Sequence, residues 1–298
     1  MKTLLLFVAF LNVAVADDSL NFDALKKSAS EGNPKAQFIL GKVYNQGRRV
    51  PKDNAEALRW VTKAAEQGLV EAQVELGISF QMGKGLVEDR DNAKGFKWFQ
   101  KAADQGDANA QYAVGISYAR GWGVEENELG AFLWLERSLH QGSKDALAWI
   151  TKSASEGNGI AQINLGNAYA NGLGVEKSYT RSIKWYRMSA EGGSSAGQAK
   201  LGMHYMNGHG VTKDHTEAAK WFQKAADQGD ASGWMLMGLS CSKGRGVPRD
   251  LVKAYMWFDL GAKHELKPWR EQRDIVEKEM TSAQITEAKR LSAEWKSK

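Results

Sequence analysis

The sequence is short of cysteine and proline: its 298 residues include one cysteine and four prolines. A single thiol has no partner for an intramolecular disulfide, so the fold has to be stabilised by packing alone. Pro51 and Pro248 fall in glycine-containing loops, and no proline interrupts a predicted helix of the repeats described below. The lone Cys241 stands at a packing position of such a helix, which favours a buried thiol over a reactive or intermolecular one.

Long apolar runs are also scarce, and the only one lies at the start of the chain, from Leu4 to Val15. It follows Lys2 and ends in the small residues Ala14-Val15-Ala16 before an acidic pair, the arrangement of a secretory signal peptide. We therefore predict a signal peptide at residues 1–16, cleaved after Ala16, and a periplasmic or secreted protein. The run is too short to span a bilayer comfortably, so an uncleaved anchor is the weaker alternative, and no membrane span is expected after cleavage.

Charge of one sign is not concentrated anywhere in the chain. The formal net charge is +5, and the loss of Lys2 with the signal peptide would leave +4. A nucleic-acid groove normally needs lysine and arginine clustered on one face, whereas here opposite charges are interspersed. We expect no nucleic-acid partner.

What the chain does contain is a repeat. The eleven residues WFQKAADQGDA occur at Trp98 to Ala108 and again at Trp221 to Ala231. The wider pattern A-Q-x-x-L-G-x-x-Y-x-x-G-x-G-V-x-x-D-x-x-x-A-x-x-W-x-x-x-A-A-x-x-G has unit starts separated by 36, 38, 51, 36 and 36 residues. A fixed period of this size indicates a solenoid, in which each unit buries its apolar face only against its neighbours. The unit starts are Ala36, Ala72, Ala110, Ala161, Gly197 and Gly233.

The irregular spacings define the predicted domain organisation. The spacing of 38 reflects two extra loop residues after Gly83, and the spacing of 51 reflects a truncated unit, since KSASEGN at Lys27 to Asn33 recurs at Lys152 to Asn158. We predict a half-repeat cap at 17–35, three repeats at 36–145, a truncated half-repeat at 146–160 that breaks the superhelix, and three repeats at 161–265. Residues 266–298 keep helical spacing and are predicted to be capping helices, with Thr281-Ser282 as an N-cap; a partner-binding tail is the alternative.

Each unit is predicted to form two helices, so the fold class is all-α. Ala36, Leu40, Gly41 and Tyr44 share one face of a 3.6-residue period, and Ala57, Trp60 and Ala64 do the same in the second helix. Loop glycines suit a left-handed C-cap, and a good N-cap residue precedes each second helix. The N-caps are Asp53, Asp91, Asn127, Ser178, Asp214 and Asp250.

The consensus ALGxxYxxGxGVxxDxxxAxxWxxxAAxxG resembles the Sel-one-like repeat, a relative of the tetratricopeptide repeat, over roughly residues 22–265. The resemblance implies a right-handed α-solenoid of helix pairs with a concave surface, used in this family mainly to hold or sense proteins. Some members carry a cysteine pair in every repeat and have been linked to penicillin binding and β-lactam hydrolysis. Because this chain has only Cys241, that subgroup and its activity are not expected here.

The sequence offers weak candidates for chemistry. Ser240-Cys241-Ser242-Lys243 matches S-x-x-K but lacks the companion S-D-N and K-T-G motifs, and the G-x-G loops are turns without a preceding strand. His204, His209 and His215 lie within twelve residues, but their spacing is not a familiar ligand pattern, which favours solvated loop histidines over a metal site. We predict no enzyme activity, no cofactor and no metal.

The variable face of each first helix is the predicted binding surface, because tetratricopeptide-like geometry would turn it toward the concave groove. It is apolar at its centre and edged by amides, which suits a peptide or protein partner. The alternative is that neighbouring units cover part of this face. Trp122, between two loop glycines, is an aromatic that either contacts a partner or folds back on its own unit. The predicted contact residues are Phe38, Lys42, Asn45, Ile78, Gln81, Tyr112, Ile116, Arg120, Asn167, Asn171, Met203, Met206, Asn207, Met235 and Lys243.

These observations predict a non-catalytic adaptor of the cell envelope or secreted space, and a monomer. Two functions from other classes stay open. One is a β-lactam-interacting enzyme, which rests on the family resemblance alone and which labelled penicillin would reveal. The other is binding of a cell-wall glycan, which a glycan array would reveal.

Overall fold

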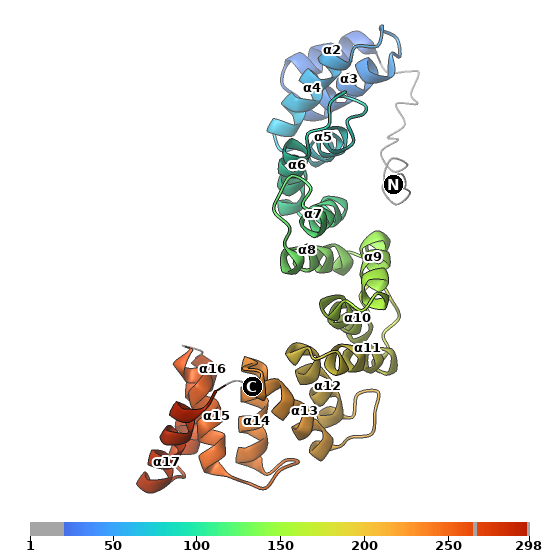
Figure 1. The fold of residues 1–298 in the computed structure, drawn as a ribbon. Helices are drawn as coiled ribbons and strands as arrows, with labels where there is room; N and C mark the ends of the chain where they lie inside the picture. The colour runs from blue at the N-terminus through green and yellow to red at the C-terminus, as the bar shows by residue number, and fades with distance from the viewer. Residues whose placement is uncertain (1–20, 265–266, 297–298) are drawn as a thin grey trace. The chain divides into compact units, whose positions relative to one another are not determined.

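The structure, a computed structural model, describes residues 21–264 and 267–296 and contains sixteen α-helices and no strand within them (Figure 1). All but the first, α9 and α16 are 13 residues long, as expected of one repeated unit. The helices are α2 (Phe22–Ser30), α3 (Pro34–Gln46), α4 (Asn54–Glu66), α5 (Val70–Met82), α6 (Asn92–Asp104), α7 (Ala108–Arg120), α8 (Glu128–His140), α9 (Lys144–Ser155), α10 (Gly159–Asn171), α11 (Tyr179–Glu191), α12 (Ser195–Asn207), α13 (His215–Asp227), α14 (Ala231–Lys243), α15 (Leu251–Lys263), α16 (Lys267–Glu277) and α17 (Ser282–Glu294).

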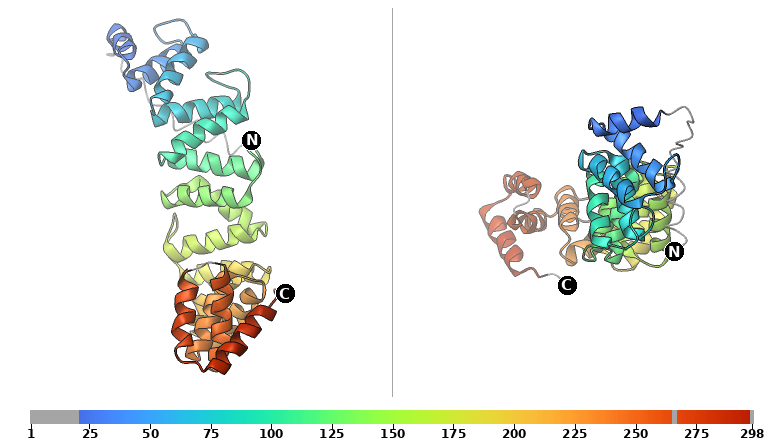
Figure 2. Two further views of the ribbon diagram at one scale, coloured as in Figure 1. Left: turned by 90° about the vertical axis from the view of Figure 1, so that its left-hand side faces the viewer. Right: turned by 90° about the horizontal axis from the view of Figure 1, so that it is seen from above.

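The chain forms two compact units, Met1–Ala146 and Leu147–Lys298, with the boundary inside α9. Within each unit the first helix of a repeat packs on the second, and the second packs on the first helix of the next repeat. The paired helices of the repeats therefore lie side by side in chain order within each unit (Figure 2). The stretch for which the sequence predicts a truncated repeat contains the single helix α9.

Helix boundaries follow from the capping residues that the sequence predicts. At the second helices the side chain of each predicted N-cap accepts a hydrogen bond from a backbone N–H of the first turn, which satisfies a donor that the helix leaves free. The first helices end at glycines in the left-handed conformation, such as Gly83 and Gly208. Thr281 caps α17 and completes a capping box with Gln284.

Within a repeat, the two helices approach closely at the glycine of the L-G pair. A Cβ atom at Gly77 would lie 2.7 Å from the ring of Phe99, and one at Gly238 would lie 2.5 Å from the ring of Phe258. Each aromatic side chain is buried against the bare backbone of the partner helix. Glycine is therefore required here by packing and not by backbone conformation.

Between repeats, one hydrogen bond recurs. The buried fourth residue of each first helix donates from its side chain to the carbonyl oxygen of the penultimate residue of the preceding helix. That carbonyl also accepts the backbone N–H of the glycine that follows the helix, so the side chain supplies its second hydrogen bond. Five of the six donors are glutamines, and the sixth is the indole of Trp234. The pairs, with donor–acceptor distances, are Gln37–Ala29 (3.1 Å), Gln73–Ala65 (3.0 Å), Gln111–Ala103 (3.4 Å), Gln162–Ala154 (3.2 Å), Gln198–Ala190 (3.3 Å) and Trp234–Ala226 (3.1 Å).

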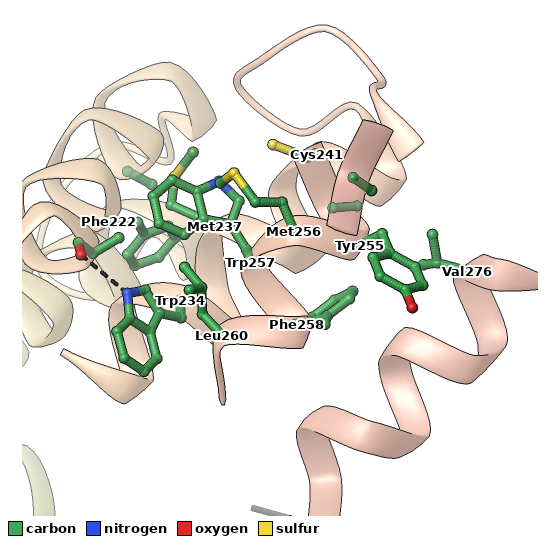
Figure 3. Close-up of a cluster of buried hydrophobic side chains, with 14 residues drawn as sticks. Phe222, Trp234, Met237, Cys241, Tyr255, Met256, Trp257, Phe258, Leu260 and Val276 are labelled. Atoms are coloured by element: carbon green, nitrogen blue, oxygen red, sulfur yellow. Dashed lines mark hydrogen bonds between the residues drawn. The ribbon is translucent and has the colours of Figure 1, made fainter. Parts of the chain in front are cut away.

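The C-terminal helices α16 and α17 cover the last repeat. Figure 3 shows Tyr255 and Phe258 of α15 in one apolar cluster with Trp234, and Val276 of α16 facing Tyr255. Ala288 of α17 is fully buried in the same cluster. Residues 267–296 therefore bury the apolar face of α15, as a terminal cap does in a solenoid.

Polar groups also fix this cap. The carboxylate of Asp259 accepts a hydrogen bond from Ser292 Oγ at 2.7 Å and one from Arg273 Nη1 at 3.2 Å. Burial raises the pKa of Asp259, but these hydrogen bonds and the charge of Lys263 outweigh it and hold the pKa below its usual value. The charged carboxylate therefore joins α15 to both α16 and α17.

Candidate functional site

Four of the predicted contact residues are buried between repeats, namely Phe38, Gln81, Tyr112 and Ile116. Each is exposed by 5% or less, so a partner could reach none of them without opening the packing. At these four positions of the N-terminal unit, neighbouring helices therefore cover the predicted binding face. The sequence left this coverage open as an alternative.

A small apolar hollow between α5 and α7 brings four predicted residues together. The amide of Gln81 in its lining is hydrogen-bonded, because Gln81 Nε2 donates to Ser117 Oγ at 3.1 Å, and Ser117 Oγ donates to the Ala113 carbonyl at 2.8 Å. Burial, followed by the charge of Asp145, raises the pKa of Tyr112 above its usual value, so its hydroxyl stays protonated. The hollow is lined by Ile78, Gln81, Met82, Phe99, Tyr112, Ala113 and Ile116.

The other predicted residues of the N-terminal unit lie nearer the surface. Lys42 is partly buried; its Nζ lies 3.7 Å from Glu75 Oε2 and 5.4 Å from the ring centroid of Phe38. Asn45 is partly exposed and Arg120 is exposed. The sequence left Trp122 as either a contact residue or a folded-back side chain. It is partly buried, and the guanidinium groups of Arg120 and Arg90 lie 4.8 Å and 5.5 Å from the centroid of its ring.

In the C-terminal unit the predicted surface is accessible. Met203 of α12 is 37% exposed, and Asn207 and Asn171 are exposed at the ends of their helices. Met206 of α12 and Met235 of α14 are both half-buried against the same apolar cluster, which brings these two helices together. Methionine side chains adapt to differently shaped partners, and terminal amides pair with peptide groups.

Two further predicted residues of this unit differ in their freedom. The Oδ1 atom of Asn167 accepts a hydrogen bond from the Tyr186 hydroxyl at 2.7 Å, so this amide is partly engaged inside the unit. Lys243, at the last position of α14, is exposed. The face of α12 and α14 is therefore methionine-rich at its centre and polar at its rim.

The expectation of solvated loop histidines is wrong for His204. This side chain is 7% exposed, with its Nδ1 2.8 Å from the carbonyl oxygen of His209. His209 in turn stacks on Tyr179 at 4.3 Å, and Tyr186 meets His204 edge-on at 5.0 Å. Most other repeats carry a small side chain at this position, such as Ser117 and Ser240, whereas here the imidazole contacts the loop backbone through the His209 carbonyl.

Desolvation lowers the pKa of His204, and this effect exceeds the opposing hydrogen bond to His209. The ring is therefore neutral in the folded protein at neutral pH. Among the described residues there is no group of three or more histidine, cysteine, aspartate or glutamate side chains placed to hold a metal ion.

Cys241 is buried, as its place in the repeat predicts, and burial raises its pKa to about 11. A thiol with this pKa is almost entirely protonated at neutral pH and is a poor nucleophile. In the same S-x-x-K match, Ser240 is buried and Lys243 is exposed. Burial of the serine and exposure of the lysine do not favour a catalytic pair at this site.

Sequence reasoning missed two recurrent features. The first is the structural role of the glutamine in A-Q, whose hydrogen-bond partner lies eight residues earlier in the preceding helix. The second is a cation over the tryptophan of the second helix, with Lys101 at 4.1 Å from Trp98 and Arg137 at 4.4 Å from Trp134. The spacing W-x-x-K/R on a helix is the signal that could have revealed the second feature.

The model of the Sel1 repeat matches six segments of the chain, at residues 34–69, 70–107, 108–143, 159–194, 195–230 and 235–265. Together these segments cover more than half of the sequence. The chain belongs to the Sel1 repeat family. The matches leave out residues 144–158, which include all of α9.

Solved structures of Sel1 repeat proteins are similar to this chain. A Sel1 repeat protein from Oxalobacter formigenes is 31% identical, with 83% of this chain and 78% of that chain covered and a TM-score of 0.42. A protective antigen with an SLR fold from uropathogenic Escherichia coli strains is 28% identical, with 90% and 77% covered and a TM-score of 0.38. No curated protein matches the chain.

The family membership sets the class of function. Sel1 repeat proteins are generally protein-interaction scaffolds, and no catalytic family is indicated for this chain. Within the part of the chain that the structure describes, no helix combines the length and apolar character needed to cross a membrane.

Proposed function

We propose that this Sel1 repeat protein is a non-catalytic scaffold of the cell envelope or secreted space that binds a peptide or protein partner on the first helices of its C-terminal unit. The observation that supports this is the accessible face of α12 and α14, where the partly exposed Met203, Met206 and Met235 are bordered by Asn207 and Lys243. The corresponding face of the N-terminal unit is closed at Phe38, Tyr112 and Ile116.

A binding assay with matched methionine variants tests this surface. The protein would be immobilised and used to capture partners from an envelope extract, which are then identified by mass spectrometry. We expect Met203→Lys with Asn207→Ala to abolish capture of a specific partner, because a desolvated ammonium group in an apolar contact is costly. The control is Met188→Lys on α11, since Met188 is 45% exposed but lies on a second helix.

Two outcomes contradict the proposal. Equal capture by the wild type and by the Met203 and Asn207 variant would place the binding surface elsewhere. Loss of capture in both methionine variants would show a general effect of added charge.

We also propose that the chain is exported, because residues 1–16 have the charge, length and cleavage motif of a signal peptide. These residues lie outside the described part of the structure. N-terminal sequencing of the protein from its native source is expected to begin at Asp17, and recovery of a chain that starts at Met1 in the cytoplasmic fraction would contradict export. Sedimentation velocity is expected to give a monomer.

A further inference from the structure

An apolar patch on α8 lies where four of the other second helices are polar. Leu129 and Leu133 are 61% and 53% exposed, and their spacing of four residues places them on one face of the helix. Glu136 continues this face and is partly exposed. We name these three residues the α8 outer surface.

One other second helix has the same pattern of side chains at these positions. The 123-residue separation of the duplicated segments relates Leu129, Leu133 and Glu136 to Val252, Met256 and Asp259 of α15. The remaining second helices instead carry a small residue, a cation and an uncharged or basic residue. These are Ala55, Arg59 and Thr62 in α4, Ala93, Lys97 and Gln100 in α6, Thr180, Lys184 and Arg187 in α11, and Thr216, Lys220 and Gln223 in α13.

On α15 this pattern lies under two helices. Met256 is 9% exposed and Val252 packs against the cluster that contains Val276 of α16 and Ala288 of α17. Asp259 is 7% exposed and receives Arg273 from α16. On α15, two apolar residues followed by an acid are thus covered by the C-terminal helices, one of which supplies an arginine to the acid.

We propose that the α8 outer surface binds an amphipathic helix of a partner protein, with apolar side chains on Leu129 and Leu133 and an arginine or lysine on Glu136. The chain's own α16 and α17 are not the occupant, because they already bury Met256 and neutralise Asp259 on α15. This surface extends the proposed scaffold function, on which it rests, by adding a second contact region on residues different from those of α12 and α14.

Charge and exposure together argue for a helix with a cationic edge. The leucines present apolar area that a helical stripe covers, as on α15. A carboxylate beside buried apolar contacts needs a counter-charge, and Asp259 finds one in a guanidinium group. A partner that lacks this cation would leave the Glu136 carboxylate desolvated and unpaired.

The probe for this surface is a fluorescein-labelled synthetic peptide of residues 267–296, which carries the apolar stripe and the arginine of the cap. It is titrated by anisotropy against the full chain. We expect Leu129→Thr with Leu133→Lys to weaken binding at least tenfold. The variant reproduces Thr216 and Lys220 of α13, so the helix is preserved.

Two matched variants sharpen the assay. Thr216→Leu with Lys220→Leu places the same leucines on α13 next to Gln223 and is expected to add no tight site. A peptide with Arg273→Glu is expected to bind the wild type weakly and to regain binding to the Glu136→Arg protein. Equal affinity of the wild-type peptide for the wild type and the Leu129 and Leu133 variant would overturn the proposal.

Sedimentation velocity tests whether a second copy of the chain, and not a partner protein, occupies the α8 outer surface. A wild-type dimer that becomes a monomer with Leu129→Thr and Leu133→Lys would overturn the partner-helix proposal. The Met203 and Asn207 variant is expected to bind the peptide like the wild type, so failure of this inference and failure of the proposed function are distinguishable.

Discussion

The two units connect their repeats with the same backbone acceptor but with different side chains. In the N-terminal unit the buried glutamine of each first helix also accepts a hydrogen bond from the glutamine that caps its own second helix, at 2.7 Å or 2.8 Å. In the C-terminal unit only the middle repeat keeps this pair, Gln198 and Gln228. Gly192 takes the capping place on α11, and in the last repeat His264 stacks on Trp234 at 5.4 Å.

The difference shows which part of the junction is indispensable. All six junctions give the penultimate carbonyl of the preceding helix a side-chain donor in addition to its backbone partner, whereas the group that supports the donor varies. A buried side-chain donor without an acceptor is costly, but the orientation of that donor can be fixed by an amide, by an aromatic stack or by packing alone. The following predictions test this interpretation.

The largest effect is expected at Trp234, which is both the donor and part of the apolar cluster (Figure 3). Trp234→Ala is expected to lower the free energy of unfolding of the C-terminal unit by about 3–5 kcal/mol, as for other large-to-small core changes. Trp234→Gln should cost less than Trp234→Ala, because the glutamine can donate to Ala226 as Gln198 donates to Ala190. Chemical denaturation measures both, and equal losses would show that the hydrogen bond contributes nothing.

A loop position distinguishes the first repeat of the N-terminal unit from the last repeat of the C-terminal unit. Arg49 has φ +65° where the last repeat has Gly246 with φ +75°. A Cβ atom at Gly246 would lie 1.8 Å from the carbonyl oxygen of His215. Gly246→Ala is therefore expected to cost about 3 kcal/mol from steric overlap and left-handed strain together.

The control for strain alone is Gly193→Ala, since Gly193 has φ +92° and no atom within 4 Å of an added Cβ. This variant is expected to cost about 1–2 kcal/mol in the same denaturation experiment. If the two alanine variants are equally stable, the close approach of the loop to His215 is not a determinant of the fold.

The glutamine pair itself is tested by comparing Gln73→Met with Gln162→Met. Gln73 both donates to Ala65 and accepts from Gln105, whereas Gln162 donates to Ala154 and its repeat has Gly192 in place of the capping glutamine. We expect losses of about 2 and about 1 kcal/mol, respectively, because each net hydrogen bond is worth about 1 kcal/mol. A larger loss at Gln162 would refute the idea that the capping glutamine adds stability.

Much of the fold follows from local patterns in the sequence. Helix starts at Asp53 and Asp214 and ends at Gly83 and Gly208 were predictable because caps act within one turn. Family membership followed from the consensus pattern that the six repeats share, and the burial of Cys241 followed from its place in the repeat.

The candidate site was less predictable, because the exposure of a first-helix face depends on how closely the next repeat packs. Tyr112 and Met203 occupy similar faces of α7 and α12, yet one is 5% and the other 37% exposed. The histidine cluster was missed for the same reason. The sequence grouped His204 and His209 with His215 but favoured solvated loop histidines, and only the fold of the loop places His204 and His209 beside Tyr179.

The smallest effect is expected at His204. It should make the stability of the C-terminal unit depend on pH in a way that the N-terminal unit does not share. Its equivalents in the second and third repeats are Ser79 and Ser117, so only the C-terminal unit buries an imidazole at this position. Desolvation lowers the pKa of His204 in the folded state, and His209 and Lys200 add repulsion. The unfolded chain therefore binds a proton more readily as pH falls below about 6.5, and the C-terminal unit loses stability in that range.

A single titrating histidine can change the free energy of unfolding by at most about 1.4 kcal/mol per pH unit. The change in melting temperature between pH 7.5 and 5 is therefore modest but measurable. His204→Ser, which installs the residue of the second and third repeats, should flatten the dependence, because its hydroxyl does not titrate in this range. A slope that persists in His204→Ser would assign the acid sensitivity to another group. An unchanged melting temperature in the wild type would mean that the cluster of His204, Tyr179 and Tyr186 accommodates the protonated ring.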